Sequence, residues 1–389
     1  MKATVTDGGL TIFLEGSVTA ASAPAFEAEL TSLRAENPSG SLTLDASDFA
    51  YISSAGLRVL MKLARKEKGL SVIEASPTVY DIFEITGFTQ ILDVRKALRQ
   101  ISVEGCECIG RGGNGAVYRL DEETIVKIYY SNRHTLDSIL NSRAVSQKLM
   151  ALGIPVAIAF DVVRVGDEGD LGLVFELLNC KTIGQVIHDD PSTIHMWAKR
   201  AADILKQLHT TEQPEGTFPD ARDTSHAWVN ETGKWLSQEE KDVLNKLYDG
   251  LPYKNTLVHG DFHTGNMMVQ DDEIVLIDVD DLAQGEPILD FASMFTTFEN
   301  ITTEERSLFT MNMTLEETQA FYKDMLECYY GPLDEQTAQR LEFQRKLYGM
   351  PKLLWGLATT TSVPDEVKAQ YIPKAKAGAL QLAAAVGIK

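Results

Sequence analysis

A run of polar residues between short apolar stretches carries the residue types that phosphoryl transfer needs. It reads LVHGDFHTGNMMVQDDEIVLIDVDD over residues 257–281. Asp261 and Asn266 are five residues apart, and the apolar stretch EIVLI then leads to Asp278. Phosphoryl transfer requires a carboxylate that accepts a hydroxyl proton and oxygen ligands that hold Mg²⁺ across the β- and γ-phosphates. Loops that follow two neighbouring strands can bring such groups together, so the segment predicts a site for metal-assisted phosphoryl transfer.

A glycine-rich segment lies upstream and reads GRGGNGAV. It fits the pattern G-x-G-x-x-G-x-V at Gly110, Gly112, Gly115 and Val117. Glycines let a backbone approach phosphates with its N–H groups facing them, although a tight hairpin would use the same residues. Lys127 follows in the strand-like segment IVKIY, from which an ammonium can reach the α- and β-phosphates. Because a strand lysine follows the glycine-rich turn, the segment indicates an ATP site.

The loop HGDFHTGN resembles the H-G-D-x-H-x-x-N loop of aminoglycoside phosphotransferases, choline kinases and their relatives. The resemblance extends over about residues 105 to 370 and implies a bilobal kinase-like fold, with ATP and Mg²⁺ as cofactors and a small hydroxylated molecule as acceptor. It implies that Asp261 is the catalytic base and that Asn266 and Asp278 bind Mg²⁺.

The same resemblance gives roles to residues around the loop. In LVFELLNC it places the hinge that meets adenine at Glu176 and Leu178. It implies that His259 holds the loop in shape and that Asp290 is a buried acid that steadies it. Two further residues can each be interpreted in two ways. His263 either orients the loop or faces the substrate, and Asp280 either assists at the metal or is a solvated acid.

One feature departs from the usual kinase pattern, in which the strand lysine pairs with a glutamate on the next helix. The sequence contains no glutamate between Lys127 and Glu168. Asp137 lies where that helix is expected and could replace the glutamate if the helix spans about 135 to 151. Otherwise phosphate alone would hold Lys127.

The first hundred residues alternate between strand-like and helical patterns. Apolar residues alternate in LTIFLEG and in SLTLDAS, as in strands with one buried face. Helices are predicted after Ser22, which could cap the first one, near Ser54, and after the Ser76-Pro77 pair. A last helix is expected at about 94 to 101. This alternation predicts a mixed sheet covered by helices.

The segment YISSAGLRVL resembles the helix-start motif of STAS domains in anti-sigma factor antagonists. Ser54 aligns with the serine that a partner kinase phosphorylates in those proteins, but the aspartate common before it is Ser53 here. A phosphate at a helix N-terminus adds about two negative charges to a docking surface, which would release a protein partner. The alternative is that the serine only caps the helix.

Together these patterns predict an α/β switch unit followed by an α+β, kinase-like unit. We expect a STAS-like domain over 1–101 and a phosphotransferase domain over 103–389. Its β-rich N-lobe would span about 103–180 and its helical C-lobe about 181–389.

The bulk properties exclude some other classes. The formal charge of −20 argues against nucleic acid or an anionic membrane as the main partner. No stretch approaches the roughly 20 apolar residues that span a bilayer, and the first residues do not resemble a signal peptide. The four cysteines form no C-x-x-C pair. A cytoplasmic protein with reduced thiols is expected.

Three functions fit the sequence. The first is an ATP- and Mg²⁺-dependent phosphotransferase that acts on a hydroxyl of a small molecule, with the STAS-like domain regulating it or binding a protein partner. The second is a regulatory nucleotide-binding protein whose output is partner binding. The third is a protein kinase that acts on a STAS serine. The complete set of Lys127, Asp261, Asn266 and Asp278 favours catalysis, and the choline-kinase-like loop favours a small substrate.

Overall fold

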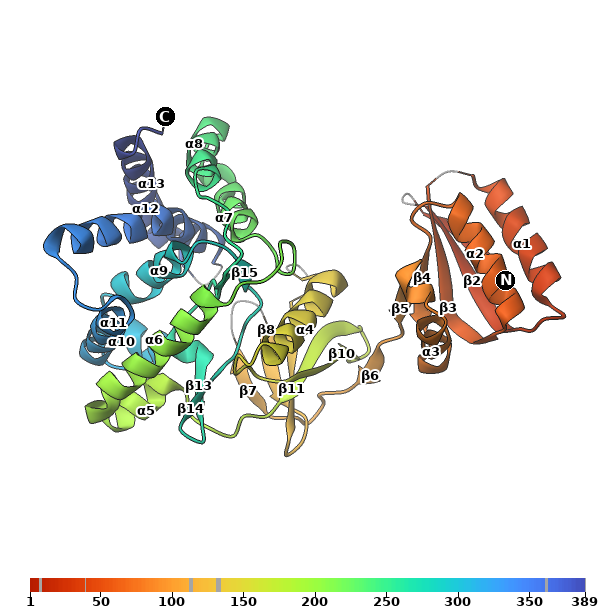
Figure 1. Ribbon diagram of the computed structural model, residues 1–389, viewed down its shortest axis with the longest axis horizontal. Helices are drawn as coiled ribbons and strands as arrows, with labels where there is room; N and C mark the ends of the chain where they lie inside the picture. Colours follow the sequence, from red (N-terminus) through yellow and green to blue (C-terminus); the bar gives the residue numbers. More distant parts are fainter. Residues whose placement is uncertain (7–8, 39, 112–114, 131–133, 361–362, 389) are drawn as a thin grey trace. The chain divides into compact units, whose positions relative to one another are not determined.

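A computed structural model describes residues 1–6, 9–38, 40–111, 115–130, 134–360 and 363–388 of the chain. Gly112, one of the predicted phosphate-loop glycines, lies outside these residues. The chain divides into two compact units, Met1–Ile101 and Ser102–Lys389, which are described separately below (Figure 1).

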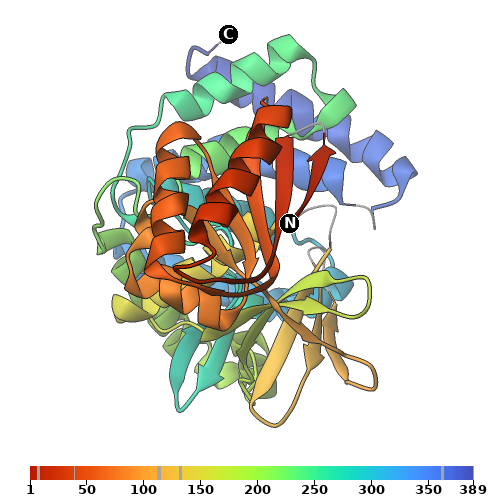
Figure 2. The ribbon, with the colours of Figure 1, turned by 90° about the vertical axis from the view of Figure 1, so that its right-hand side faces the viewer.

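The first unit is a five-stranded sheet with helices packed on it. The strands lie in the order β1-β2-β3-β4-β5, and all neighbours are parallel except the β1–β2 pair. The strands are β1 (Lys2–Thr6), β2 (Gly9–Val18), β3 (Ser41–Ile52), β4 (Ser71–Ala75) and β5 (Asp93–Lys96). The helices are α1 (Ala23–Glu36), α2 (Ser54–Lys66) and α3 (Pro77–Ile85). Helices α1 and α2 lie side by side (Figures 1 and 2).

The predicted alternation along β2 is confirmed, because Leu10, Ile12 and Leu14 are all buried in the core of this unit. Two local features explain where α2 begins and how closely it packs on the sheet. Ser53, not Ser54, is the N-cap, and its hydroxyl accepts a hydrogen bond from the Gly56 N–H at 3.4 Å. A side chain at Gly56 would lie within 2.8 Å of atoms of Ile52 and Val18, so the close approach of α2 to the sheet requires glycine there.

Two predictions for this unit are wrong. Ser22 precedes α1 but makes no capping bond; its hydroxyl instead accepts from the Thr19 N–H at 2.9 Å. The helix expected at about 94 to 101 is replaced by β5 and by a second short strand, β6 (Arg99–Ile101). Strand β5 pairs with β4 and packs Val94 against the core, so nonlocal sheet pairing overrides the local pattern. The predicted Ser76 cap is confirmed, since its hydroxyl accepts from the Val79 N–H.

The second unit begins with an antiparallel sheet and one helix. Five of its strands pair in the order β10-β11-β9-β8-β7. They are β7 (Cys108–Arg111), β8 (Gly115–Arg119), β9 (Thr124–Tyr129), β10 (Ala159–Val165) and β11 (Asp170–Glu176). Helix α4 (Leu136–Ala151) packs on β10 and β11.

The rest of this unit is mostly helical, which confirms the predicted order of a β-rich part and a helical part. Before the loop region come α5 (Ile183–Asp189), α6 (Ile194–Thr210), α7 (Ala221–Asn230) and α8 (Gln238–Asp249). The loop region contains two small antiparallel pairs: β12 (Leu257–Val258) with β15 (Ala283–Gln284), and β13 (Met267–Gln270) with β14 (Glu273–Leu276). After it come α9 (Ile288–Met294), the π-helical turn η5 (Phe295–Glu299), α10 (Glu304–Met311), α11 (Leu315–Tyr330), α12 (Glu335–Thr359) and α13 (Asp365–Ala385). None of the helices in the described part of the chain has the length and apolar character needed to cross a bilayer.

We expect a fragment of residues 1–101 to fold alone, because it contains its own sheet, caps and buried core. Its circular dichroism should show helix and strand, with a single cooperative thermal transition. Leu44→Ala, at a fully buried site, should lower the stability of the fragment by about 2–5 kcal/mol. A fragment without a cooperative transition would contradict the boundary.

Candidate active site

The predicted base and metal ligands lie together in the loops around β12, β13 and β14. Asp261 and Asn266 follow β12, and the Asn266 amide nitrogen donates to the Asp261 backbone oxygen at 3.0 Å. Because an amide is planar, this bond directs the Asn266 side-chain oxygen away from Asp261. Asp278 follows β14 with a φ of +55°, in the left-handed region that is costly for a residue with a side chain.

A buried carboxylate fixes the start of this loop. Asp290 on α9 is fully buried and accepts from the His259 N–H at 2.9 Å and the Gly260 N–H at 2.7 Å. It also pairs with His209 of α6 at 2.9 Å. Burial opposes ionisation, but the His209 hydrogen bond and the nearby histidines outweigh it and lower the Asp290 pKa. Asp290 is therefore the steadying acid that the sequence indicated.

The two histidines of the loop also bond within it. The His259 Nδ1 atom accepts from the Asp261 N–H at 3.2 Å, in agreement with a role in loop shape. The His263 Nδ1 atom accepts from the Gly265 N–H at 3.1 Å, and its Nε2 atom lies 3.5 Å from Asp261 Oδ2. These contacts favour the loop-orienting interpretation of His263.

A lysine that the sequence analysis did not single out reaches the same loop. The Lys352 ammonium on α12 donates to the Gly260 backbone oxygen at 2.7 Å and lies 3.4 Å from Asp261 Oδ1. Burial alone would raise the pKa of Asp261. The charge of Lys352 and the hydrogen bond from His263 outweigh burial and hold the Asp261 pKa well below its usual range. Asp261 is therefore ionised at neutral pH.

A cavity of about 340 Å³ lies between the β-sheet and the loops that carry Asn266 and Asp278. Its lining includes seven of the predicted site residues: Gly110, Val117, Lys127, Glu176, Leu178, Asn266 and Asp278. Gly115 does not line it. A side chain there would lie 2.0 Å from the Ile128 backbone oxygen, so strand pairing alone requires that glycine. The Glu176 carboxylate accepts from the Ile158 N–H at 2.7 Å, and the Glu176 N–H donates to the Ile158 backbone oxygen at 3.1 Å, so this residue is tied to the neighbouring strand.

Lys127 has a partner that the sequence did not suggest. Its ammonium lies 2.6 Å from Asp278 Oδ1 and 2.8 Å from Asp280 Oδ2. Burial opposes its charge, but these two carboxylates outweigh it and raise the Lys127 pKa. Asp137 lies exposed in the first turn of α4. The helix itself agrees with the expected span, but neither Asp137 nor phosphate alone is what holds Lys127.

Asp280 is the second partner of this lysine. Burial would raise the Asp280 pKa, but the charge of Lys127 outweighs it and lowers the pKa. Ser142 of α4, the helix that carries the glutamate in other kinases, lines the same cavity, but its hydroxyl donates to the Ser138 backbone oxygen at 3.2 Å. An aspartate from the loop after β14 thus lies beside Lys127 where other kinases place the helix glutamate. With a side chain only 17% exposed, Asp280 is not a solvated acid, and its part at a metal stays a prediction.

The donor chemistry of the cavity suits Mg²⁺. Asn266 and Asp278 offer amide and carboxylate oxygens, which are the ligand types that Mg²⁺ prefers. The described residues contain no group of three or more His, Cys, Asp or Glu side chains placed to hold a metal by themselves. Mg²⁺ is usually bound by one or two carboxylates with substrate phosphates and water, so a two-residue set fits a nucleotide-bound metal.

Comparison with known proteins identifies the second unit. Residues 107–312, more than half of the chain, match the family model of phosphotransferase enzymes. The chain belongs to this family. Residues 1–94 match the model of the MlaB-type STAS domain. Over 92 residues the chain is 38% identical to a putative anti-sigma factor antagonist, BtrV, of Bordetella bronchiseptica, covering 23% of this chain and 78% of that protein. The N-terminal unit is therefore a STAS domain.

One solved structure supports the fold of the phosphotransferase. The amicoumacin kinase hAmiN, solved in complex with AMP-PNP, Ca²⁺ and Ami, matches with a TM-score of 0.51 at 16% identity, over 79% of this chain and 94% of that one. Aminoglycoside phosphotransferase APH(2'')-Ib with ADP gives a TM-score of 0.48 at 14% identity, over 71% and 93% of the two chains. At this identity the first match shows the fold alone.

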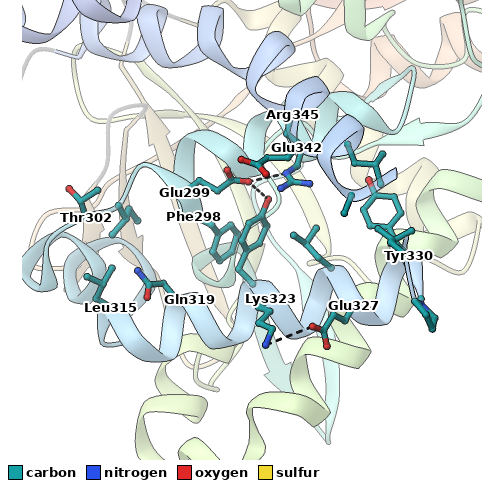
Figure 3. Close-up of a pocket in the computed structure, with 18 residues that line it drawn as sticks. Phe298, Glu299, Thr302, Leu315, Gln319, Lys323, Glu327, Tyr330, Glu342 and Arg345 are labelled. Atoms are coloured by element: carbon teal, nitrogen blue, oxygen red, sulfur yellow. Dashed lines mark hydrogen bonds and ion pairs between the residues drawn. The ribbon is translucent and has the colours of Figure 1, made fainter. Parts of the chain in front are cut away.

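The phosphotransferase contains a second, larger cavity of about 1040 Å³, formed by η5, α11 and α12 (Figure 3). Phe298 and Tyr322 stack within it at 4.8 Å. The Glu299 carboxylate accepts from the Tyr322 hydroxyl at 3.0 Å and from Arg345 Nε at 2.9 Å. Much of this cavity lies beyond residue 312, where the family match ends.

Ser54, the predicted phosphosite, is exposed at the first position of α2 in the STAS domain. Its hydroxyl is not the helix cap, since Ser53 has that role. The local geometry therefore leaves Ser54 accessible at a helix N-terminus without assigning it a structural task.

The contacts of Lys127 predict that Asp280→Asn weakens Mg²⁺–ATP binding about tenfold, which corresponds to about 1.4 kcal/mol. The substitution keeps the shape of the side chain but removes one of two charges that hold the lysine. Asp137→Asn is the matched control and should leave the affinity unchanged. Calorimetric titration of both variants with Mg²⁺–ATP checks this, and the opposite ranking would restore Asp137 as the partner of Lys127.

Proposed function

We propose that this phosphotransferase uses ATP and Mg²⁺ to phosphorylate a hydroxyl group of a small molecule. The observation that carries the proposal is the convergence of Lys127, Asn266 and Asp278 on one cavity, with Asp261 bonded to Asn266 at its edge. The STAS domain, in this proposal, regulates the enzyme or binds a protein partner.

Each of these residues has one task in the reaction. Asp261 orients the acceptor hydroxyl and accepts its proton as the new oxygen–phosphorus bond forms and the bond to the bridging oxygen of ATP breaks. Asn266 and Asp278 would hold Mg²⁺, which supplies positive charge beside the phosphates. Lys127 would meet the α- and β-phosphates in the cavity that Gly110 also lines.

The edge of the cavity at Glu176 and Leu178 would receive the adenine through backbone groups, and Val117 would cover the base. In phosphoryl transfer the protein contributes mainly positioning and electrostatic stabilisation. The lowered pKa of Asp261 is compatible with a positioning role. An ionised carboxylate can orient the hydroxyl without being a strong base before the reaction begins.

The larger cavity is the proposed place of the acceptor. Its wall η5 continues α9, and Ser293 of α9 contacts Lys352 beside Asp261. Glu299, at the end of η5, lines the cavity. An acceptor bound there would present a hydroxyl to Asp261.

A screen of ATP consumption against sugars, amino alcohols and aminoglycosides tests the function. Asp261→Asn should keep Mg²⁺–ATP binding within about twofold but lower turnover at least about a hundredfold, the usual contribution of a positioned base. Asp278→Ala should lose Mg²⁺-dependent nucleotide binding, because a direct ligand is removed.

Turnover of Asp261→Asn near that of the wild type would exclude Asp261 as the base. Mass spectrometry of the protein from the same incubations tests the protein-kinase alternative. Stoichiometric phosphate on Ser54 that is absent in Asp261→Asn would replace the small-molecule proposal.

Once an acceptor is found, Ala338→Trp should raise its KM at least about tenfold, a loss of about 1.4 kcal/mol, and leave the KM for ATP unchanged. Ala338 is exposed and lines the larger cavity, so a bulky side chain there obstructs the space without disturbing the core. Steady-state kinetics with each substrate varied in turn measure both constants. An unchanged acceptor KM would place the acceptor elsewhere.

A further inference from the structure

Lys352 is a buried lysine in an apolar part of α12, in the segment YGMPKLLWG. Its side chain is 10% exposed. The family match ends at residue 312, so α12 adds this residue from outside the matched region. A buried ammonium is costly unless its hydrogens are bonded and its charge is balanced. The contacts of Lys352 must therefore compensate for the burial of its charge.

The donors of Lys352 are fully used. An ammonium has three N–H donors, and this one has three acceptors: Ser293 Oγ at 2.6 Å, the Gly260 backbone oxygen at 2.7 Å and Asp261 Oδ1 at 3.4 Å. The ammonium also lies 5.0 Å from the ring centre of Trp228, which favours a cation. No donor is left for a phosphate, and Lys352 does not line the nucleotide cavity. These contacts indicate positioning rather than phosphate binding.

The object that Lys352 positions is the loop residue pair Gly260–Asp261. Asp290 binds the Gly260 N–H, while Lys352 binds the Gly260 carbonyl oxygen. The backbone at Gly260 is thus held by Asp290 of α9 and by Lys352 of α12. Ser293 of α9 also accepts a hydrogen bond from this lysine and so joins the two helices.

Both oxygens of the Asp261 carboxylate have polar neighbours. Oδ1 lies 3.4 Å from the Lys352 ammonium, and Oδ2 lies 3.5 Å from His263 Nε2 and from the Asn266 amide nitrogen. Rotation of the carboxylate would separate Oδ1 from the lysine. The lysine therefore restricts the orientation in which Asp261 meets the acceptor hydroxyl.

We propose that Lys352 is a positioning residue for phosphoryl transfer, which fixes the orientation of the Asp261 carboxylate toward the acceptor hydroxyl. This inference rests on the proposed role of Asp261. It differs from a purely structural role, in which methionine of similar length would fill the site without effect on turnover.

The test compares Lys352→Met and Ser293→Ala with Lys374→Met in the full chain. Lys374 is the matched control, because it also lies over an aromatic ring, 5.5 Å from Tyr371, but on the exposed face of α13. Two measurements are made on each protein: the kcat and the KM for ATP with the acceptor found by the screen, and hydrogen exchange of the amides in residues 259–266.

Lys352→Met should lower kcat about 10- to 100-fold and leave the KM for ATP within about twofold, since a misplacement of about 1 Å can cost about 10² in rate. Exchange in residues 259–266 should become faster. Ser293→Ala keeps the lysine but removes one partner, so it should shift both measurements in the same direction by a smaller amount. Lys374→Met should match the wild type.

A kcat of Lys352→Met within twofold of the wild type, or unchanged exchange in the loop, would overturn the proposal. An increase in the KM for ATP equal to the loss in kcat would do so as well, because it would indicate general disruption. If Lys352→Met does not fold, an unchanged kcat and exchange in Ser293→Ala would decide against the proposal. Absence of acceptor-dependent turnover in the wild type would refute the proposed function instead, and the exchange measurement would still show whether Lys352 orders the loop.

Discussion

The buried Asp290 carboxylate is the constraint on which the candidate active site depends. A carboxylate without solvent is unfavourable unless it is hydrogen-bonded, and here both oxygens accept, from two backbone N–H groups and His209. These bonds form together only when the backbone at His259 and Gly260 has one particular path. The direction of Asp261, the next residue, follows from that path. The loop is therefore rigid because of the cost of leaving a buried charge unpaired.

The remaining charges of the site balance one another in the same way. Lys352 is matched by Asp261 and two neutral acceptors, and Lys127 is matched by Asp278 and Asp280. Removing one member of such a set leaves the other buried and unpaired, which costs more than the interaction itself contributes. Substitutions here consequently change stability and function together. Shape-preserving replacements such as Asp280→Asn separate the two effects better than truncation to alanine.

How far the sequence predicted this site depends on how local each contact is. The loop HGDFHTGN carries the proposed base, a proposed metal ligand and the internal histidine bonds within eight residues, so the sequence alone could place these residues together. Lys352 contacts Asp261 across 91 residues, and only a lysine in an apolar run marked it. The strands at 93–101 were missed for the same reason, since β5 exists through pairing with β4. The cap at Ser53 was misplaced by one position, because Ser53 and Ser54 are both good capping residues.

The replacement of the helix glutamate changes what a movement of α4 can do. In a kinase whose lysine pairs with a glutamate on this helix, displacement of the helix breaks the ion pair itself. Here Lys127 is held by Asp278 and Asp280, which are two residues apart on one loop. A displacement of α4 would leave both of these ion pairs in place. The position of Lys127 is thus coupled to the loop of Asp278 and Asp280 more strongly than to the helix, and a signal that acts on this lysine would have to move that loop.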